Sequence, residues 1–158
     1  MNQPAPAVAV HKGLGKVVAD LRDLPPKGKW VDHPCCCVAA EESVVRARGE
    51  PLRALLQVLM LGAELIRSDQ ALAVDCAARW TKMPVEVERT SIPTVGYVSE
   101  PTETWLAGMR VWAEMVQGIG FFKGTFANKP PGQVVREACS LDLCRSAAAE
   151  LRAKGRIR

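Results

Sequence analysis

Apolar residues recur at steps of three and four along most of the chain, which is the spacing of one face of an α-helix. The clearest example follows Pro51, where an apolar stripe that needs a partner surface is formed by Leu52, Leu55, Leu56, Leu59, Ala63 and Ile66. The whole pattern predicts helices at residues 41–48, 51–66, 69–80, 84–90, 100–120 and 134–155, the last interrupted near Ser140. We therefore expect a mainly helical chain.

Two short apolar runs near the N-terminus break this helical pattern. Residues 16–21 (KVVADL) are rich in β-branched side chains, and the turn-rich segment after them contains Pro25 and Pro26, which exclude a helix there. Residues 35–40 (CCCVAA) form a compact apolar run of strand length. The predicted class is α/β, mostly helical, with a few short strands near the N-terminus.

This pattern predicts a boundary at residue 40. Residues 1–40 are expected to be a strand and loop segment, and residues 41–158 a helical segment that packs on a first lobe. The apolar helix at 51–66 carries Arg53, Gln57 and Glu64, so we expect a core helix and not a membrane span.

Composition and charge narrow the class of protein. The 158 residues are 48% hydrophobic and 5% aromatic, as expected for one packed helical domain. The net charge of +4 is spread along the chain, so no nucleic-acid partner is predicted. The first residues lack the basic start and the apolar stretch of a secretory signal, and the localisation of the protein is left open by these features.

The stretch HPCCC, residues 33–37, is the richest in reactive groups. In a strand, Cys35 and Cys37 point to one face and Cys36 to the other, and the C-x-x-C spacing of zinc sites is absent. We expect the thiols to fill small buried spaces, with His33 nearest to any cleft; contact with a ligand cleft and direct metal or thiolate chemistry are the alternatives. No catalytic residue, metal or cofactor is predicted, and His33, Cys35, Cys36 and Cys37 are the ligand-cleft candidates.

Five segments in order also carry a family resemblance. They are GLGKVVADL at 13–21, DHPCCCVAA at 32–40, RARGEPLRALLQVLMLGAELI at 46–66, AARWTKMPVEVE at 77–88 and WLAGMRVWAEMVQGIGFFKG at 105–124. Together they resemble the solute-binding proteins of ABC importers for nitrate, sulfonate and taurine, which include binding proteins for thiamine pyrimidine precursors. The resemblance implies the C-terminal portion of a type II periplasmic binding protein fold, in which residues 35–40 would be the crossover strand near the hinge.

The function that this resemblance implies is solute binding for an ABC-type importer, by a whole receptor or a fragment of one. The solute would be a small anion or a related molecule such as nitrate, sulfonate, taurine or a thiamine pyrimidine precursor. The partners would be that solute and the ABC transporter permease, and proteins of this family are extracytoplasmic. No enzymatic activity is expected from this reading.

Two alternative functions stay open. One is an enzyme similar to the thiamine pyrimidine precursor synthases, which share the superfamily and have a cysteine-rich motif close to the active site. The other is a helical interaction module with no ligand, in which an exposed apolar stripe would form a homodimer.

Overall fold

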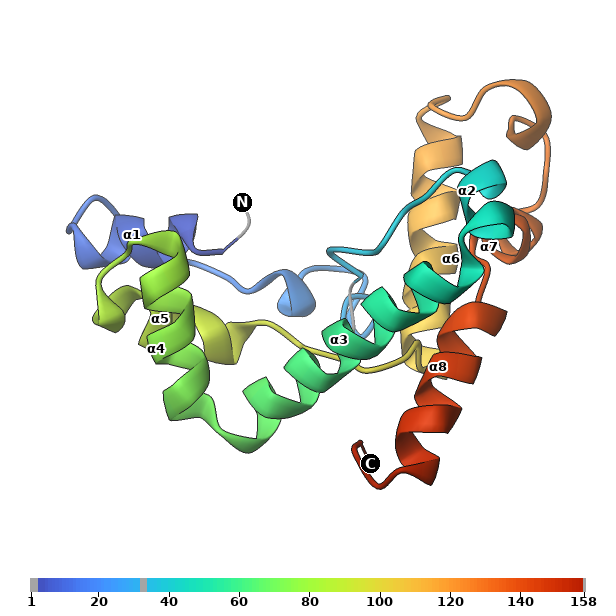
Figure 1. The fold of residues 1–158 in the computed structure, drawn as a ribbon. Helices are drawn as coiled ribbons and strands as arrows, with labels where there is room; N and C mark the ends of the chain where they lie inside the picture. Colours follow the sequence, from blue (N-terminus) through green and yellow to red (C-terminus); the bar gives the residue numbers. More distant parts are fainter. Residues whose placement is uncertain (1–2, 32–33, 158) are drawn as a thin grey trace.

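The structure, a computed structural model, describes residues 3–31 and 34–157, and every regular element in those ranges is helical (Figure 1). The α-helices are α1 (Ala5–His11), α2 (Glu42–Ala47), α3 (Gly49–Ser68), α4 (Gln70–Thr81), α5 (Val85–Ser91), α6 (Glu103–Gly118), α7 (Pro131–Ala138) and α8 (Asp142–Ala153). Short 3₁₀ helices are η1 (Leu21–Asp23), η2 (Ile92–Thr94) and η3 (Gly124–Phe126).

The predicted α/β class is wrong, because none of the described residues belongs to a strand. Residues 16–20 and 35–40 have no regular secondary structure, and Val17, Val18 and Val38 are exposed. A strand needs a neighbouring strand to accept and donate its backbone hydrogen bonds, and the described chain offers none to either segment. The strand expected near a hinge at residues 35–40 is therefore absent, and residues 3–31 contain α1 and η1 instead.

Most of the predicted helices are confirmed, and local signals mark their ends. Asp69 precedes α4, and its carboxylate accepts a hydrogen bond from the backbone N–H of Leu72 at 2.9 Å. Thr102 caps α6 in the same way, through a 3.0 Å bond from the backbone N–H of Trp105. The interruption near Ser140 is the break between α7 and α8. Helix α1 was not predicted, and α7 begins at Pro131, earlier than the apolar pattern indicates.

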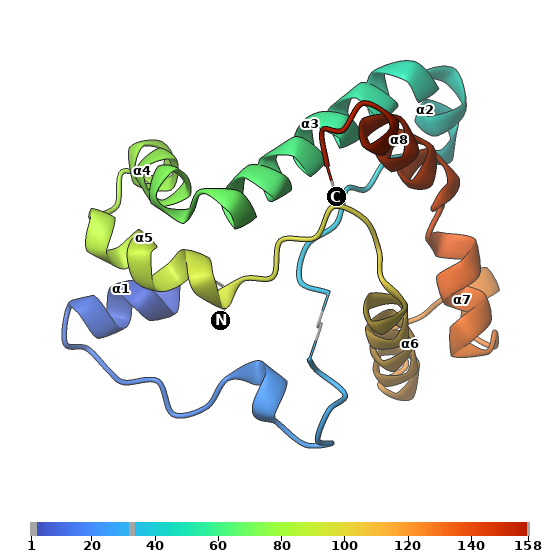
Figure 2. The same cartoon turned by 90° about the horizontal axis from the view of Figure 1, so that it is seen from below.

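The helices are arranged openly, and α3 runs between the group of α1, α4 and α5 and the group of α6, α7 and α8 (Figures 1 and 2). At its C-terminal end, α3 contacts α4, which packs on α5, and α5 in turn packs on α1. At its N-terminal half, α3 lies against α8, while α6 and α7 pack on each other beside them. None of the described helices combines the length and the apolar character that crossing a membrane requires.

The buried core is divided into three small clusters. Each lies where two or three elements meet: Met60, Ala147, Ala148, Leu151 and Ile157 between α3 and α8; Ala73, Val74 and Ile92 between α4 and η2; and Ala113, Val134 and Val135 between α6 and α7. Each cluster contains at least one buried alanine, and at these short side chains the helices can come close together.

The accessible surface shows how open the chain is. A compact monomer of 17.1 kDa exposes about 7,750 Å², whereas this chain exposes 11026 Å². The excess is about 3,300 Å² for one chain. Residues 21–29 and 35–44, which are all exposed, contribute to this excess.

Polar contacts reinforce the packing of α8 on α3. Arg53 of α3 forms an ion pair with Glu150 of α8, and Gln57 donates a hydrogen bond to the other carboxylate oxygen of Glu150 at 2.9 Å. One acidic side chain is thus held by two residues one helical turn apart, and this fixes the register of the two helices.

We expect substitution of Ala148 by leucine to destabilise the chain by about 1–3 kcal/mol, because Ala148 is fully buried between α8 and α3 and has no room for added atoms. The neighbouring Ala149→Leu is the matched control, since Ala149 is exposed and its change should stay within about 0.5 kcal/mol. Urea unfolding followed by circular dichroism measures both. Equal midpoints for the two variants would contradict the packing described here.

Candidate functional site

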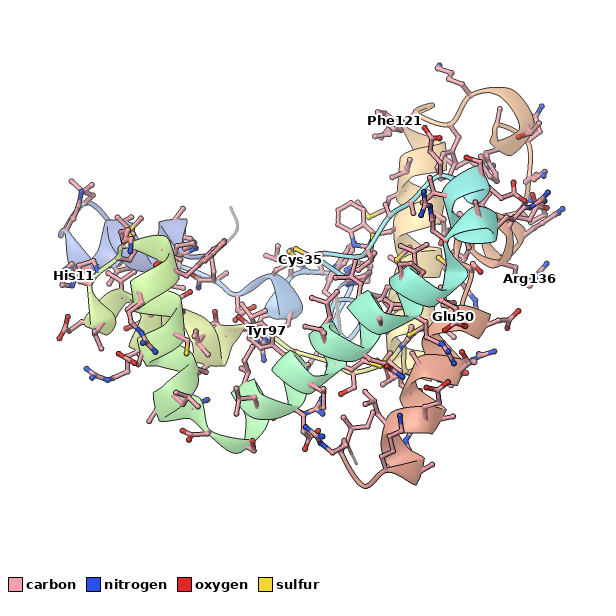
Figure 3. The ribbon with its side chains drawn as sticks, viewed as in Figure 1. His11, Cys35, Glu50, Tyr97, Phe121 and Arg136 are labelled. Atoms are coloured by element: carbon pink, nitrogen blue, oxygen red, sulfur yellow. The ribbon has the colours of Figure 1, made fainter. Side chains whose placement is uncertain are left out.

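The cysteine candidates lie on the surface. Cys35, Cys36 and Cys37 are all exposed, so the expectation that they fill buried spaces is wrong (Figure 3). The thiol of Cys36 donates a hydrogen bond to the Sγ of Cys35 at 3.6 Å, which means that these two side chains lie together and do not alternate as in a strand. His33 lies outside the described residues.

Cys35 has the electrostatics of a weak nucleophile. Its hydrogen bond with Cys36 raises the pKa of Cys35 above its ordinary value, and desolvation and the neighbouring charge of Cys36 act in the same direction. Burial raises the pKa of Cys139 and of Cys144 as well. Reactive cysteines show the opposite shift. In the described part of the chain, no three His, Cys, Asp or Glu side chains lie together as metal ligands would.

Two shallow depressions mark the surface, and neither contains a cysteine candidate. One lies at the start of α3 and is lined by Arg46, Arg48, Arg53 and Ser146, among others. Two of its basic side chains already have acidic partners, since Arg46 pairs with Glu42 and Arg53 pairs with Glu50 as well as with the carboxylate of α8. Two of the three arginines that line the depression are thus neutralised within the chain.

An apolar surface on α3 is the other candidate site. Four large side chains on one side of this helix face solvent: Leu55 is 46% exposed, Val58 65%, Leu59 47% and Leu65 44%. Gly62 lies among them at helical spacing, and no described side chain comes within 4 Å of the place that a Cβ atom would take there. We call Leu55, Val58, Leu59, Gly62 and Leu65 the open face of α3.

The charged residues of α3 occupy the opposite side of the helix. At 100° per residue, Glu50, Arg53, Glu64 and Arg67 all fall on the half that faces α8 and the segment around Tyr97. Arg67, for example, pairs with Glu64 and donates hydrogen bonds to the backbone oxygen of Tyr97 at 3.0 Å and to Ser99 Oγ at 2.8 Å. One side of α3 thus presents large apolar side chains to solvent without any charge among them, while Glu50 and Arg67 on the other side are exposed as well.

The apolar stripe predicted from the sequence is only partly covered. Leu56 packs against α8 and Ala63 is buried, whereas Leu55 and Leu59 belong to the open face. In the sequence analysis, Val58 and Leu65 were not placed on a surface, although both lie at helical spacing from Leu55. The signal was hidden because α3 has apolar residues on both of its sides, and only the fold tells which side α8 covers.

Three of the most exposed apolar side chains outside α3 lie in different surroundings. Trp80, which is 87% exposed, lies on α4 beside the exposed ion pair of Arg79 with Asp75. Ile119 and Phe121 lie beyond the end of α6, in the turn that follows it. The open face of α3 differs from both because its residues follow one another at helical spacing from Leu55 to Leu65 and include no charge.

Comparisons with known proteins give no match to a family model, to a curated protein or to a solved structure. The resemblance to importer solute-binding proteins therefore stays a prediction that the comparisons do not test. The same holds for the solute, the permease and the synthase-like alternative.

We expect Cys36→Ala to increase the rate at which iodoacetamide alkylates Cys35 at pH 8. Removal of the neighbouring thiol lowers the pKa of Cys35 toward its ordinary value, and at a pH below that value a lower pKa leaves more thiolate. Cys37→Ala is the matched control, because Cys37 does not contribute to the raised pKa of Cys35. Peptide mass spectrometry reads the rate at Cys35 alone; an unchanged rate in Cys36→Ala would show that the pair does not interact.

Proposed function

We propose that this chain is a helical interaction module that binds a helical segment of a protein through the open face of α3. The observation that carries the proposal is the uncharged side of α3, where four large apolar side chains are exposed to solvent while every charged side chain lies on the other half. Contiguous exposed apolar surfaces on soluble folds mark sites where another protein binds.

The shape of the open face suits a helix as its ligand. The face runs from Leu55 to Leu65, about 15 Å along the helix, and side chains at steps of three and four form a ridge that fits the groove of a second helix. Gly62 has no side chain and no neighbour within 4 Å of a Cβ position, so a partner backbone or a branched side chain can come close there. Both ends of α3 are held in place, by α8 at one end and α4 at the other, so binding would require little ordering of this element.

Solute binding and catalysis find less support in the geometry. The two depressions on the surface are shallow, and the thiol pair lies exposed and outside both. The importer and enzyme functions stay predictions, with no specific observation in their favour.

Photo-crosslinking from within the open face tests the proposal in cells that express the chain naturally. A benzophenone amino acid at position 58 replaces an exposed valine, and the same group at position 149 on the exposed side of α8 is the matched control. We expect position 58 to give one product with a single protein, identified by mass spectrometry, and position 149 to give none. A Leu59→Glu change in the same chain should reduce the product at least about tenfold, because a carboxylate is costly to bury in an apolar contact.

The proposal fails if position 58 gives no protein product or the same products as position 149. It also fails if the product is insensitive to Leu59→Glu, since the partner would then bind elsewhere.

A further inference from the structure

We infer that the partner of the open face of α3 is a second copy of this chain, packed antiparallel across a twofold axis level with Met60. This inference rests on the proposed function and names its partner. In a twofold contact the same surface meets itself, so that surface must be self-complementary in both charge and shape.

The charge condition is met by the open face. Helices that select a different partner do so with charged residues that flank the apolar seam. On α3 the charged residues lie on the far half and already have partners within the chain, including Arg53 with Glu150 and Arg67 with Glu64. Two copies can therefore approach without placing like charges opposite each other.

The shape condition is met in one register. With the axis level with Met60, residues an equal number of positions before and after it lie at the same height on the two helices. Val58 of one copy then lies level with Gly62 of the other, so that the most exposed side chain of the face enters the open space above the glycine. Leu55 lies level with Leu65, and the two Leu59 side chains lie next to the axis. The antiparallel orientation also places opposite ends of the two helix dipoles together.

The size of the contact sets a further condition. A stable interface buries about 800 Å² on each partner. The large side chains of the open face are only partly exposed, so a dimer of that size also buries the surface that flanks them on α3.

Sedimentation equilibrium of the purified full chain tests this inference. A reducing agent is included because Cys35, Cys36, Cys37 and Cys76 are exposed and could link copies covalently. We expect the chain to be a dimer when its concentration is raised to about 100 μM. Leu59→Glu puts two carboxylates beside the axis and should raise the dissociation constant at least about 100-fold. Ala149→Glu, at an exposed position of α8, is the control and should leave it unchanged.

A pair of variants tests the register. Gly62→Val alone places valine opposite Val58 and should weaken the dimer about tenfold. The double change Val58→Ala with Gly62→Val exchanges the large and the small position and should return the dissociation constant to within about threefold of the original. Circular dichroism confirms that each variant keeps its helical content, which the exposure of these positions leads us to expect.

Each contrary outcome has a separate meaning. A monomer at every concentration, or a dimer insensitive to Leu59→Glu, overturns the second copy as partner. If the crosslink from position 58 then leads to a different protein, the interaction module stands and only its partner changes; if there is no crosslink either, both proposals fail. A dimer that Leu59→Glu disrupts but the double change does not restore overturns the antiparallel register.

Discussion

The packing of α8 against α3 is the contact on which the rest of this structure depends. Ala147 and Ala148 have no accessible surface and bring the two helices close together, while Arg53 and Gln57 hold Glu150 and set their register. Because α3 has apolar residues on both its charged and its uncharged side, the position of α8 decides which of them stay exposed to solvent. In this structure the uncharged side is left exposed.

Several observations then follow from one cause. Arg53 anchors α8 and Arg67 anchors the segment near Tyr97, and neither lies on the side of α3 that faces water with Leu55 and Val58. The exposure of Leu55, Val58 and Leu59 expresses an imbalance between one helix and the few elements that cover it. A bound helix would correct that imbalance, which is why the interaction module explains more of the structure than a ligand cleft does.

The helices could be predicted from the sequence because their signals are local. Asp69, Thr102 and Pro84 each start a helix with their own side chain or ring, whatever the rest of the chain does. The strands could not be, because CCCVAA and KVVADL have strand-like composition but a strand exists only with a neighbour, and that neighbour is a property of the whole fold.

The candidate site was predictable to a similar extent. The apolar stripe that includes Leu55 and Leu59 is a local pattern, and the need for a partner surface was evident from it. Its exposed half was not, since exposure depends on where α8, nearly a hundred residues away along the chain, comes to rest. The exposure of Cys35 to Cys37 was missed for the same reason, because thiols are usually buried and only tertiary contacts decide otherwise.

The division of the core into three small clusters affects how the chain loses its structure. In a domain with one contiguous core, a break anywhere exposes the whole core, and this makes unfolding cooperative. Here the cluster of Ala73, Val74 and Ile92 can open while Met60 stays buried against α8. Amide protection should then fall into separate groups along the chain, and α3, which joins two of them, would carry both slow and fast exchanging amides on a single helix.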